Sequence, residues 1–200
     1  KVGYTSIDTA MIYKNEKGVG RAIAESSVPR DELFITTKVW NADQGFEKTL
    51  RAFEESLDRL GLDYIDLYLI HWPTPNFDQY VDTYEALEKL YHDGGVKAIG
   101  VCNFEVELLE RILKECEVVS VLNQVECHPY LAQNELKEFC AKHNIFVEAW
   151  SPLDQGGEVL QDEVIQKIAA SHSKTPAQAV LRWHLQNNTI VIPKSVTPSR

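Results

Sequence analysis

The chain lacks the features that would assign it to a membrane, a secretory route or a nucleic acid. No apolar run approaches the roughly 18 to 20 residues that a membrane-spanning helix needs, and the first residues do not form a secretory signal. Positive charge is scarce, because 20 Lys and Arg stand against 30 Asp and Glu, a formal net charge of −10. We therefore expect a cytoplasmic protein without membrane or nucleic-acid partners, in which only a local basic pocket could bind a phosphate.

Cysteine is also scarce, with four residues and no Cys-x-x-Cys pair. Cys102, Cys116, Cys127 and Cys140 are widely spaced, so we expect reduced thiols that serve the structure. Only Cys127 and His128 suggest a metal site, but adjacent residues of a strand point to opposite faces and cannot both bind one ion. We therefore expect no metal.

The sequence does contain short apolar runs, rich in Ile, Val and Leu, that alternate with longer segments of helical period. This alternation is typical of β-α units around a parallel sheet whose strands are buried on both faces. We predict strands at residues 6–8, 33–37, 65–70, 98–101, 121–125, 146–149 and 190–192.

The segments between these runs carry one apolar stripe each. The clearest stripe steps by four and three residues and ends at Gly61, a C-cap; its members are Phe46, Leu50, Phe53, Leu57 and Leu60. Similar spacing predicts helices around residues 81–90, 108–113 and 136–140. Another helix should begin at Thr175-Pro176, with Thr as N-cap and Pro in the first helical position.

Successive parallel strands suit either an open doubly wound sheet or a barrel. A dinucleotide-binding open sheet should carry Gly-x-Gly-x-x-Gly directly after its first strand, whereas Gly18-Val-Gly20 comes later and has Ile23 in place of the third glycine. We interpret this glycine pair as a helix-packing feature.

Polar or aromatic residues follow each predicted strand, as in barrels whose active site collects at the carboxyl ends of the strands. In chain order they are Asp8, Lys38, His71 with Trp72, Cys102 with Asn103, Gln124 with Glu126 and His128, Trp150 with Ser151, and Lys194 with Ser195.

Seven motifs stand in order along the chain: GYTSIDTAMIYKNE, FITTKVWN, LIHWP, IGVCNF, NQVECHP, EAWSPL and IPKSVTPSR. Together they resemble the aldo-keto reductase superfamily, in particular its small bacterial and protist members. The resemblance implies an α/β fold of the (β/α)8 TIM-barrel class, with residues 1–200 as a single domain. It also implies reduction of a small aldehyde or ketone by NADPH, and a monomer.

The resemblance places the family's catalytic tetrad on Asp8, Tyr13, Lys38 and His71. It implies that the cofactor is bound by Asn103, Gln124, Trp150, Ser151, Leu153, Lys194, Ser195, Thr197 and Arg200. The substrate pocket would include Ile12, Trp40 and Trp72. Cys102 stands where most relatives have Ser, and because a thiol is a weak hydrogen-bonding group this change puts one nicotinamide contact in doubt.

The tetrad also agrees with the chemistry of carbonyl reduction. Hydride addition leaves an alkoxide unless a proton arrives as well, and a tyrosine hydroxyl can supply that proton. We expect Lys38 to lower the pKa of Tyr13, Asp8 to hold Lys38 in place and keep it charged, and His71 to orient the carbonyl.

Alternatives stay open at this point. A (β/α)8 barrel usually needs about 250 residues, so we expect that a first strand and helix, and a C-terminal helix and loop, are missing from this chain. A non-enzymatic NADPH-binding subunit of the same fold would keep the cofactor residues without turnover. A metal-dependent hydrolase would need a His-x-His pair, which is absent. An unrelated nucleotide-binding open sheet is the remaining possibility.

Overall fold

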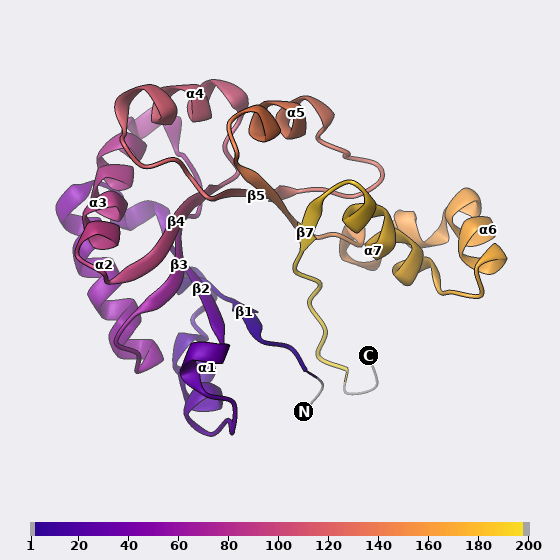
Figure 1. The fold of residues 1–200 in the computed structure, drawn as a ribbon, viewed down its shortest axis with the longest axis horizontal. Coiled ribbons are helices and arrows are strands. Elements are labelled where there is room, and N and C mark those ends of the chain that lie inside the picture. Colours follow the sequence, from indigo (N-terminus) through magenta and orange to yellow (C-terminus); the bar gives the residue numbers. More distant parts are fainter. Residues whose placement is uncertain (1–2, 198–200) are drawn as a thin grey trace. The chain divides into compact units, whose positions relative to one another are not determined.

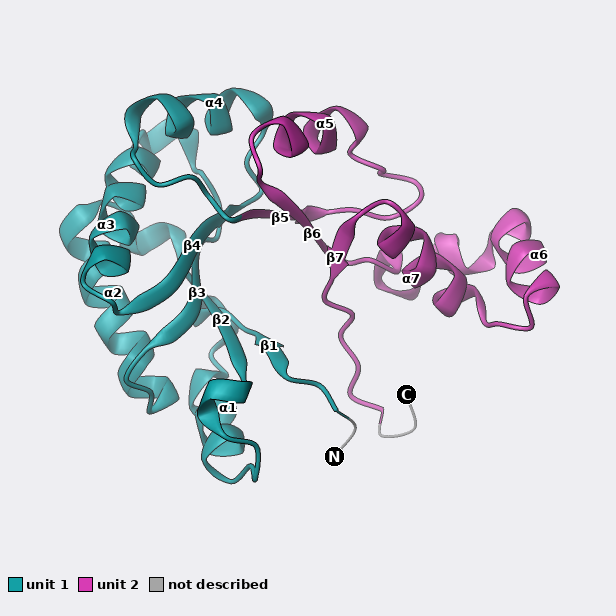
Figure 2. Ribbon diagram, viewed as in Figure 1, with its two compact units in different colours: residues 1–121 teal, residues 122–200 magenta. Residues whose placement is uncertain are grey.

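The computed structural model describes residues 3–197, and the chain divides into two compact units, residues 1–121 and residues 122–200 (Figure 2). Each unit contains a parallel sheet accompanied by helices (Figure 1). Among the described residues, none of the helices has both the length and the apolar character that crossing a membrane requires.

The sheet of unit 1 consists of four parallel strands that pair in chain order. They are β1 (Ser6–Asp8), β2 (Phe34–Val39), β3 (Ile65–Ile70) and β4 (Val96–Cys102). All six residues of β3 are buried, which explains the continuous apolar run that predicted this strand. Because parallel strands end at the same edge, residues that close or follow β1 to β4 lie along one edge of this sheet.

The described part of unit 1 contains four α-helices: α1 (Glu16–Ala24), α2 (Phe46–Leu60), α3 (Tyr80–His92) and α4 (Val106–Glu115). The predicted stripe of α2 packs on the sheet, where the ring centroids of Phe53 and Tyr68 lie 5.3 Å apart. Gly61 ends α2 in the left-handed conformation with φ 65°, so the predicted C-cap is confirmed.

Gly20 lies where α1 approaches the end of α2. A Cβ atom at this position would stand 2.2 Å from the carbonyl oxygen of Leu60, closer than any real contact. Gly18 has no such neighbour, because the nearest atom to its Cβ position would be Arg21 Nη2 at 4.0 Å. The predicted packing role is therefore confirmed for Gly20 alone.

Up to residue 197, where the description ends, unit 2 has three parallel strands, β5 (Leu122–Glu126), β6 (Phe146–Trp150) and β7 (Thr189–Val191). Its α-helices are α5 (Asn134–Lys142), α6 (Glu163–Ser171) and α7 (Pro176–Gln186). Thr175 caps α7 as predicted: its hydroxyl accepts from the amide of Gln178 at 3.2 Å, and the Gln178 side chain accepts from the amide of Thr175 at 3.0 Å.

Short 3-10 helices complete the connections. They are Met11–Tyr13, Arg30–Glu32, Asn41–Asp43, Pro75–Phe77, Asp154–Gly156 and Glu158–Gln161. Every predicted strand is present, with bounds that differ from the prediction by up to two residues.

Candidate active site

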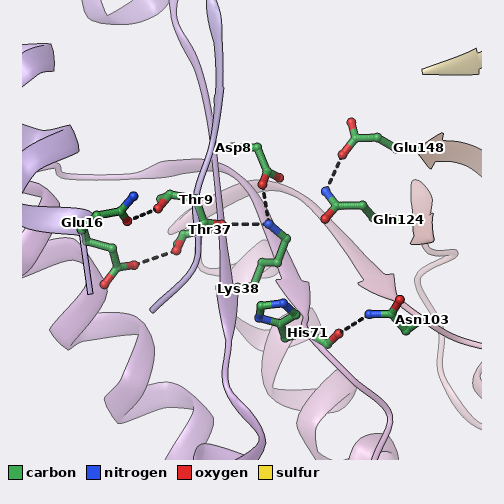
Figure 3. A network of polar contacts seen from close by, with 10 residues as sticks. Asp8, Thr9, Glu16, Thr37, Lys38, His71, Asn103, Gln124 and Glu148 are labelled. Atoms are coloured by element: carbon green, nitrogen blue, oxygen red, sulfur yellow. Dashed lines mark hydrogen bonds and ion pairs between the residues drawn. The ribbon is translucent and has the colours of Figure 1, made fainter. Parts of the chain in front are cut away.

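A buried ion pair forms the centre of the candidate site in unit 1. Lys38, in β2, donates from Nζ to Oδ1 of Asp8, the last residue of β1, at 2.6 Å, and to the carbonyl oxygen of Thr9 at 2.9 Å (Figure 3). The Lys38 side chain is 0% exposed. Burial lowers the pKa of Lys38 and is the largest single effect, but the Asp8 carboxylate, Cys102 and Tyr13 together outweigh it, so the pKa of Lys38 is raised. Lys38 is therefore a charged ammonium.

Tyr13 comes from the connection between β1 and α1, where it ends the single 3-10 turn Met11–Tyr13. Its ring centroid lies 5.5 Å from Lys38 Nζ, and its side chain is 51% exposed. The phenol of Tyr13 therefore lies near the Lys38 ammonium and is also accessible from solvent.

The predicted lowering of the Tyr13 pKa is wrong for this structure. Partial burial raises the pKa of Tyr13, and this effect exceeds the lowering by the Lys38 ammonium; Asp8 raises the pKa further. The physical reason is that partial burial removes water that would stabilise the phenolate, while the carboxylate of Asp8, 2.6 Å from Nζ, offsets part of the opposing effect of the lysine. Tyr13 therefore keeps its proton at neutral pH.

His71 follows β3 directly and is 9% exposed. Its ring meets Tyr13 edge-on, with centroids 5.7 Å apart, and meets Trp40 edge-on at 5.1 Å. Burial, with a contribution from Lys38, lowers the pKa of His71 to about 4. Its buried Nδ1 atom has no hydrogen-bond partner among the described residues. His71 is thus a neutral imidazole whose Nδ1 forms no hydrogen bond with the described part of the chain.

The other unit 1 residues predicted for the site lie around this group. Asn103 follows β4 with φ 62°, and its amide donates to the carbonyl oxygen of His71 at 2.9 Å. Cys102 is buried at the end of β4. Trp72, next to His71, is 41% exposed, and Ile12 is partly buried. Unit 1 therefore brings together the tetrad, Trp40 and Asn103.

The remaining predicted cofactor residues belong to unit 2. Gln124, in β5, is 3% exposed and its amide donates to a carboxylate oxygen of Glu148 in β6. Trp150 ends β6, and Ser151 and Leu153 follow it. The predicted residues Lys194, Ser195 and Thr197 follow β7 and are exposed; the Thr197 amide donates to the Ser195 hydroxyl at 3.3 Å. Arg200 lies outside the described residues.

The sequence prediction missed a polar network at the start of α1. Glu16 is 1% exposed, and its carboxylate accepts from the hydroxyl of Thr37 and from Nε of Arg59, both at 2.6 Å. Thr9 donates from its hydroxyl to Oδ1 of Asn15 at 2.6 Å. The only sequence signal was an acidic residue directly after Asn15 at the start of a helix, and such residues are common on exposed helices.

A second missed residue is Gln44, which is 1% exposed and follows the 3-10 turn after β2. Its amide donates to the carbonyl oxygen of Trp72 at 2.6 Å, and its own carbonyl accepts from the hydroxyl of Thr74. Gln44 thus holds the segment that follows His71. No sequence pattern distinguished it from an exposed loop glutamine.

With this geometry in view, comparison with known proteins decides the family. A family model described as the Aldo/keto reductase family matches residues 1–200. The chain belongs to the aldo/keto reductase family. It is an oxidoreductase, and the fold class predicted from the sequence, an α/β fold of the (β/α)8-barrel class, is confirmed. The open-sheet and metal-hydrolase alternatives are therefore wrong.

Several relatives are identical to this chain at more than half of the aligned residues. It is 58% identical over 200 residues to the glyoxal reductase of Bacillus subtilis and 53% identical over 201 residues to the methylglyoxal reductase DkgA of Salmonella typhimurium. These matches cover all of the chain and 71% and 72% of the relatives. A solved variant of the protein Gox0644 in complex with NADPH is 56% identical with a TM-score of 0.94, over 99% of this chain and 71% of that one.

Proposed function

We propose that this aldo/keto reductase reduces small aldehydes and ketones to alcohols with NADPH, and that Tyr13 donates the proton. The observation that carries the proposal is the arrangement in unit 1, where a buried Asp8–Lys38 ion pair stands beside a half-exposed phenol and a neutral imidazole. NADPH supplies the hydride when it is bound, and the residues of the chain manage the proton.

Tyr13 suits the role of proton donor because its raised pKa keeps the phenol protonated until the carbonyl oxygen gains negative charge. An ammonium has three N–H donors, and Lys38 uses two of them for Asp8 and Thr9. We propose that the third faces the Tyr13 hydroxyl and stabilises the phenolate that remains after proton transfer.

His71 is proposed to orient the substrate. A neutral imidazole can donate one hydrogen bond and accept another, and its pKa of about 4 keeps it neutral at physiological pH. The edge-on contacts with Tyr13 and Trp40 fix the plane of its ring. Trp40, Trp72 and Ile12 would provide the apolar wall beside the carbonyl.

The chain also offers groups that fit NADPH. The amides of Asn103 and Gln124 suit the carboxamide of a nicotinamide, and the indole of Trp150 suits its flat ring. Ser151 and Leu153 would hold the middle of the cofactor. Lys194, Ser195 and Thr197 are exposed and lie close together in the sequence, and an ammonium with two hydroxyls fits a phosphate monoester. We propose these roles, together with Arg200 for the same phosphate.

Small dicarbonyl compounds are the proposed substrates. The two named relatives, which share 58% and 53% of their aligned residues with this chain, are called glyoxal and methylglyoxal reductases. Because one family model spans residues 1–200, we also propose that the two compact units belong to one domain. For a reductase of this kind we propose a cytoplasmic monomer.

The decisive experiment combines purified protein, NADPH and methylglyoxal and follows the loss of reduced nicotinamide absorbance. Tyr13→Phe should lower turnover by roughly 10²- to 10⁴-fold while NADPH binding, measured by fluorescence titration, stays unchanged. Tyr91→Phe is the matched control, because Tyr91 is an exposed tyrosine of α3.

Two results would contradict the proposal. Wild-type turnover in Tyr13→Phe would remove the tyrosine from the chemistry. NADPH binding without consumption of any reactive aldehyde would instead identify a non-enzymatic NADPH-binding subunit of the same fold.

A further inference from the structure

Two hydrogen bonds connect the start of α1 to residues that adjoin the buried ion pair. Thr9 directly follows Asp8, and its hydroxyl donates to Oδ1 of Asn15 at 2.6 Å. Thr37 directly precedes Lys38, and its hydroxyl donates to Oε1 of Glu16 at 2.6 Å (Figure 3). Neither bond takes part in the proposed chemistry, so another purpose has to explain them.

Thr9 is the junction between the ion pair and the segment that carries Tyr13. It is 0% exposed, its amide donates to the carbonyl oxygen of Thr36 at 2.9 Å, and its carbonyl accepts from Lys38 Nζ at 2.9 Å. The backbone of Thr9 is therefore held from both sides. The Thr9 hydroxyl, in turn, donates a hydrogen bond to Asn15, which lies two residues after Tyr13 in the chain.

The segment between Thr9 and Asn15 has little support of its own. It contains a single 3-10 turn, held by the bonds from the Tyr13 amide to Ala10 at 3.0 Å and from the Lys14 amide to Met11 at 3.1 Å. Lys14 leaves the turn in the left-handed conformation, with φ 55°. Because 3-10 bonds have poor geometry and short turns are weak, the position of the phenol depends on how both ends of the segment are held.

Glu16 holds the helix itself. Its carboxylate is buried and is bound by Thr37 from one strand and by Arg59 from α2. Loss of the Thr9–Asn15 bond would therefore leave α1 in place and free only the turn that precedes it.

We infer that Asn15, acting through Thr9, is a positioning residue that holds the Tyr13 turn against the Asp8–Lys38 pair. The inference rests on the proposed role of Tyr13 as proton donor. The hydrogen bond joins the two ends of the Tyr13 segment, Thr9 and Asn15. Because the Thr9 carbonyl also accepts from Lys38 Nζ, this bond holds the phenol at a defined position relative to the ammonium. Without the bond, the fold persists but the phenol is misplaced when the proton is needed.

The test removes each half of the bond separately. Asn15→Ala deletes the acceptor at an exposed position, where folding is not at stake, and Thr9→Val deletes the donor with little change in shape. In single-turnover mixing of the enzyme–NADPH complex with methylglyoxal, both variants should oxidise NADPH about 10- to 100-fold more slowly. Affinities for NADPH and methylglyoxal should stay unchanged, and the solvent deuterium isotope effect on that rate should increase because proton transfer becomes limiting.

Three comparisons give the test its specificity. The double variant should be no slower than either single variant, because both act through one bond. Thr9→Ser, which keeps the hydroxyl, should recover most of the rate. Thr49→Val is the matched control: Thr49 is 0% exposed in the same unit and donates to the carbonyl oxygen of Asp43 at 3.0 Å, so its loss should cost stability without slowing NADPH oxidation.

The outcomes separate this inference from the proposed function. Wild-type single-turnover rates in Asn15→Ala and Thr9→Val would overturn the positioning role, and so would rate losses that add in the double variant. In either case an inactive Tyr13→Phe would still support the proposed function. A wild-type protein that never oxidises NADPH would overturn both.

Discussion

The Nζ atom of Lys38 lies 2.6 Å from Oδ1 of Asp8, and the two side chains are 0% and 14% exposed. A buried ion pair of this kind gains little over an apolar pair, but the loss of one partner leaves the other charge uncompensated in a medium of low dielectric. The relationship between these two residues therefore governs both the stability of unit 1 and the charge next to Tyr13.

Asp8→Asn should lower the free energy of unfolding by about 3–5 kcal/mol, because Lys38 stays buried without its carboxylate. The same change should lower the pKa of Lys38, since Asp8 is the main group that raises it. Urea unfolding at neutral pH measures the first effect. Asp93→Asn is the control, because it breaks an exposed ion pair: the side chain of Lys89 is 48% exposed and that of Asp93 is 58% exposed. This change should alter stability by less than about 1 kcal/mol. Equal losses in both variants would show that the Asp8–Lys38 pair is not buried as described.

His71 should make the protein sensitive to acid. Its pKa in the folded state is about 4, below the value of about 6.5 that an unfolded chain gives it. Between these values the unfolded state binds more protons, so stability increases with pH through this window and is lost as the pH falls from about 6.5 towards 4. The loss attributable to His71 should approach about 3 kcal/mol, since each pKa unit corresponds to about 1.4 kcal/mol.

Unfolding by urea at neutral pH and at mildly acidic pH measures this dependence. His71→Gln should reduce the difference between the two conditions, because glutamine does not titrate. His172→Gln, at an exposed position after α6, should keep the wild-type difference. An unchanged difference in His71→Gln would refute the assignment of the acid sensitivity to this imidazole.

Gly20 should tolerate no side chain, whereas Gly18 in the same helix should accept one. A Cβ at Gly20 would meet the Leu60 carbonyl oxygen at 2.2 Å and push α1 away from α2, which should cost about 1–3 kcal/mol. Gly18→Ala meets no atom closer than 4.0 Å and should stabilise the protein by up to about 1 kcal/mol through helix propensity. Thermal unfolding of Gly18→Ala and Gly20→Ala measures both effects, and a stable Gly20→Ala would show that the helices do not approach so closely.

Much of the local structure was predictable from the sequence, because it follows from signals that stand close together. The strand at Ile65–Ile70 is buried on both faces and consists of one continuous apolar run. The α2 stripe and the cap at Gly61 follow from helical spacing and from the left-handed conformation that glycine adopts readily. The seven ordered motifs identified the family for the same reason, since each motif spans only a few neighbouring residues.

The surroundings of the candidate site were less predictable. Glu16 looks like an ordinary first-turn residue of a helix, yet it is 1% exposed because Thr37 and Arg59 reach it from other elements. The predicted lowering of the Tyr13 pKa failed because it depends on how burial balances against Lys38 and Asp8, and that balance changes with distances of a few ångströms.

The order of residues along this chain thus determined its elements, its family and the side chains that stand at the ends of its strands. Those properties depend on periodicity and on neighbouring residues, which a sequence displays directly. Only the tertiary structure decided which of the other polar groups are buried and paired, and that His71 stays neutral. Burial and pairing join residues such as Thr9 and Asn15 or Glu16 and Arg59 across turns and helices, and such contacts come into being only when the chain is packed.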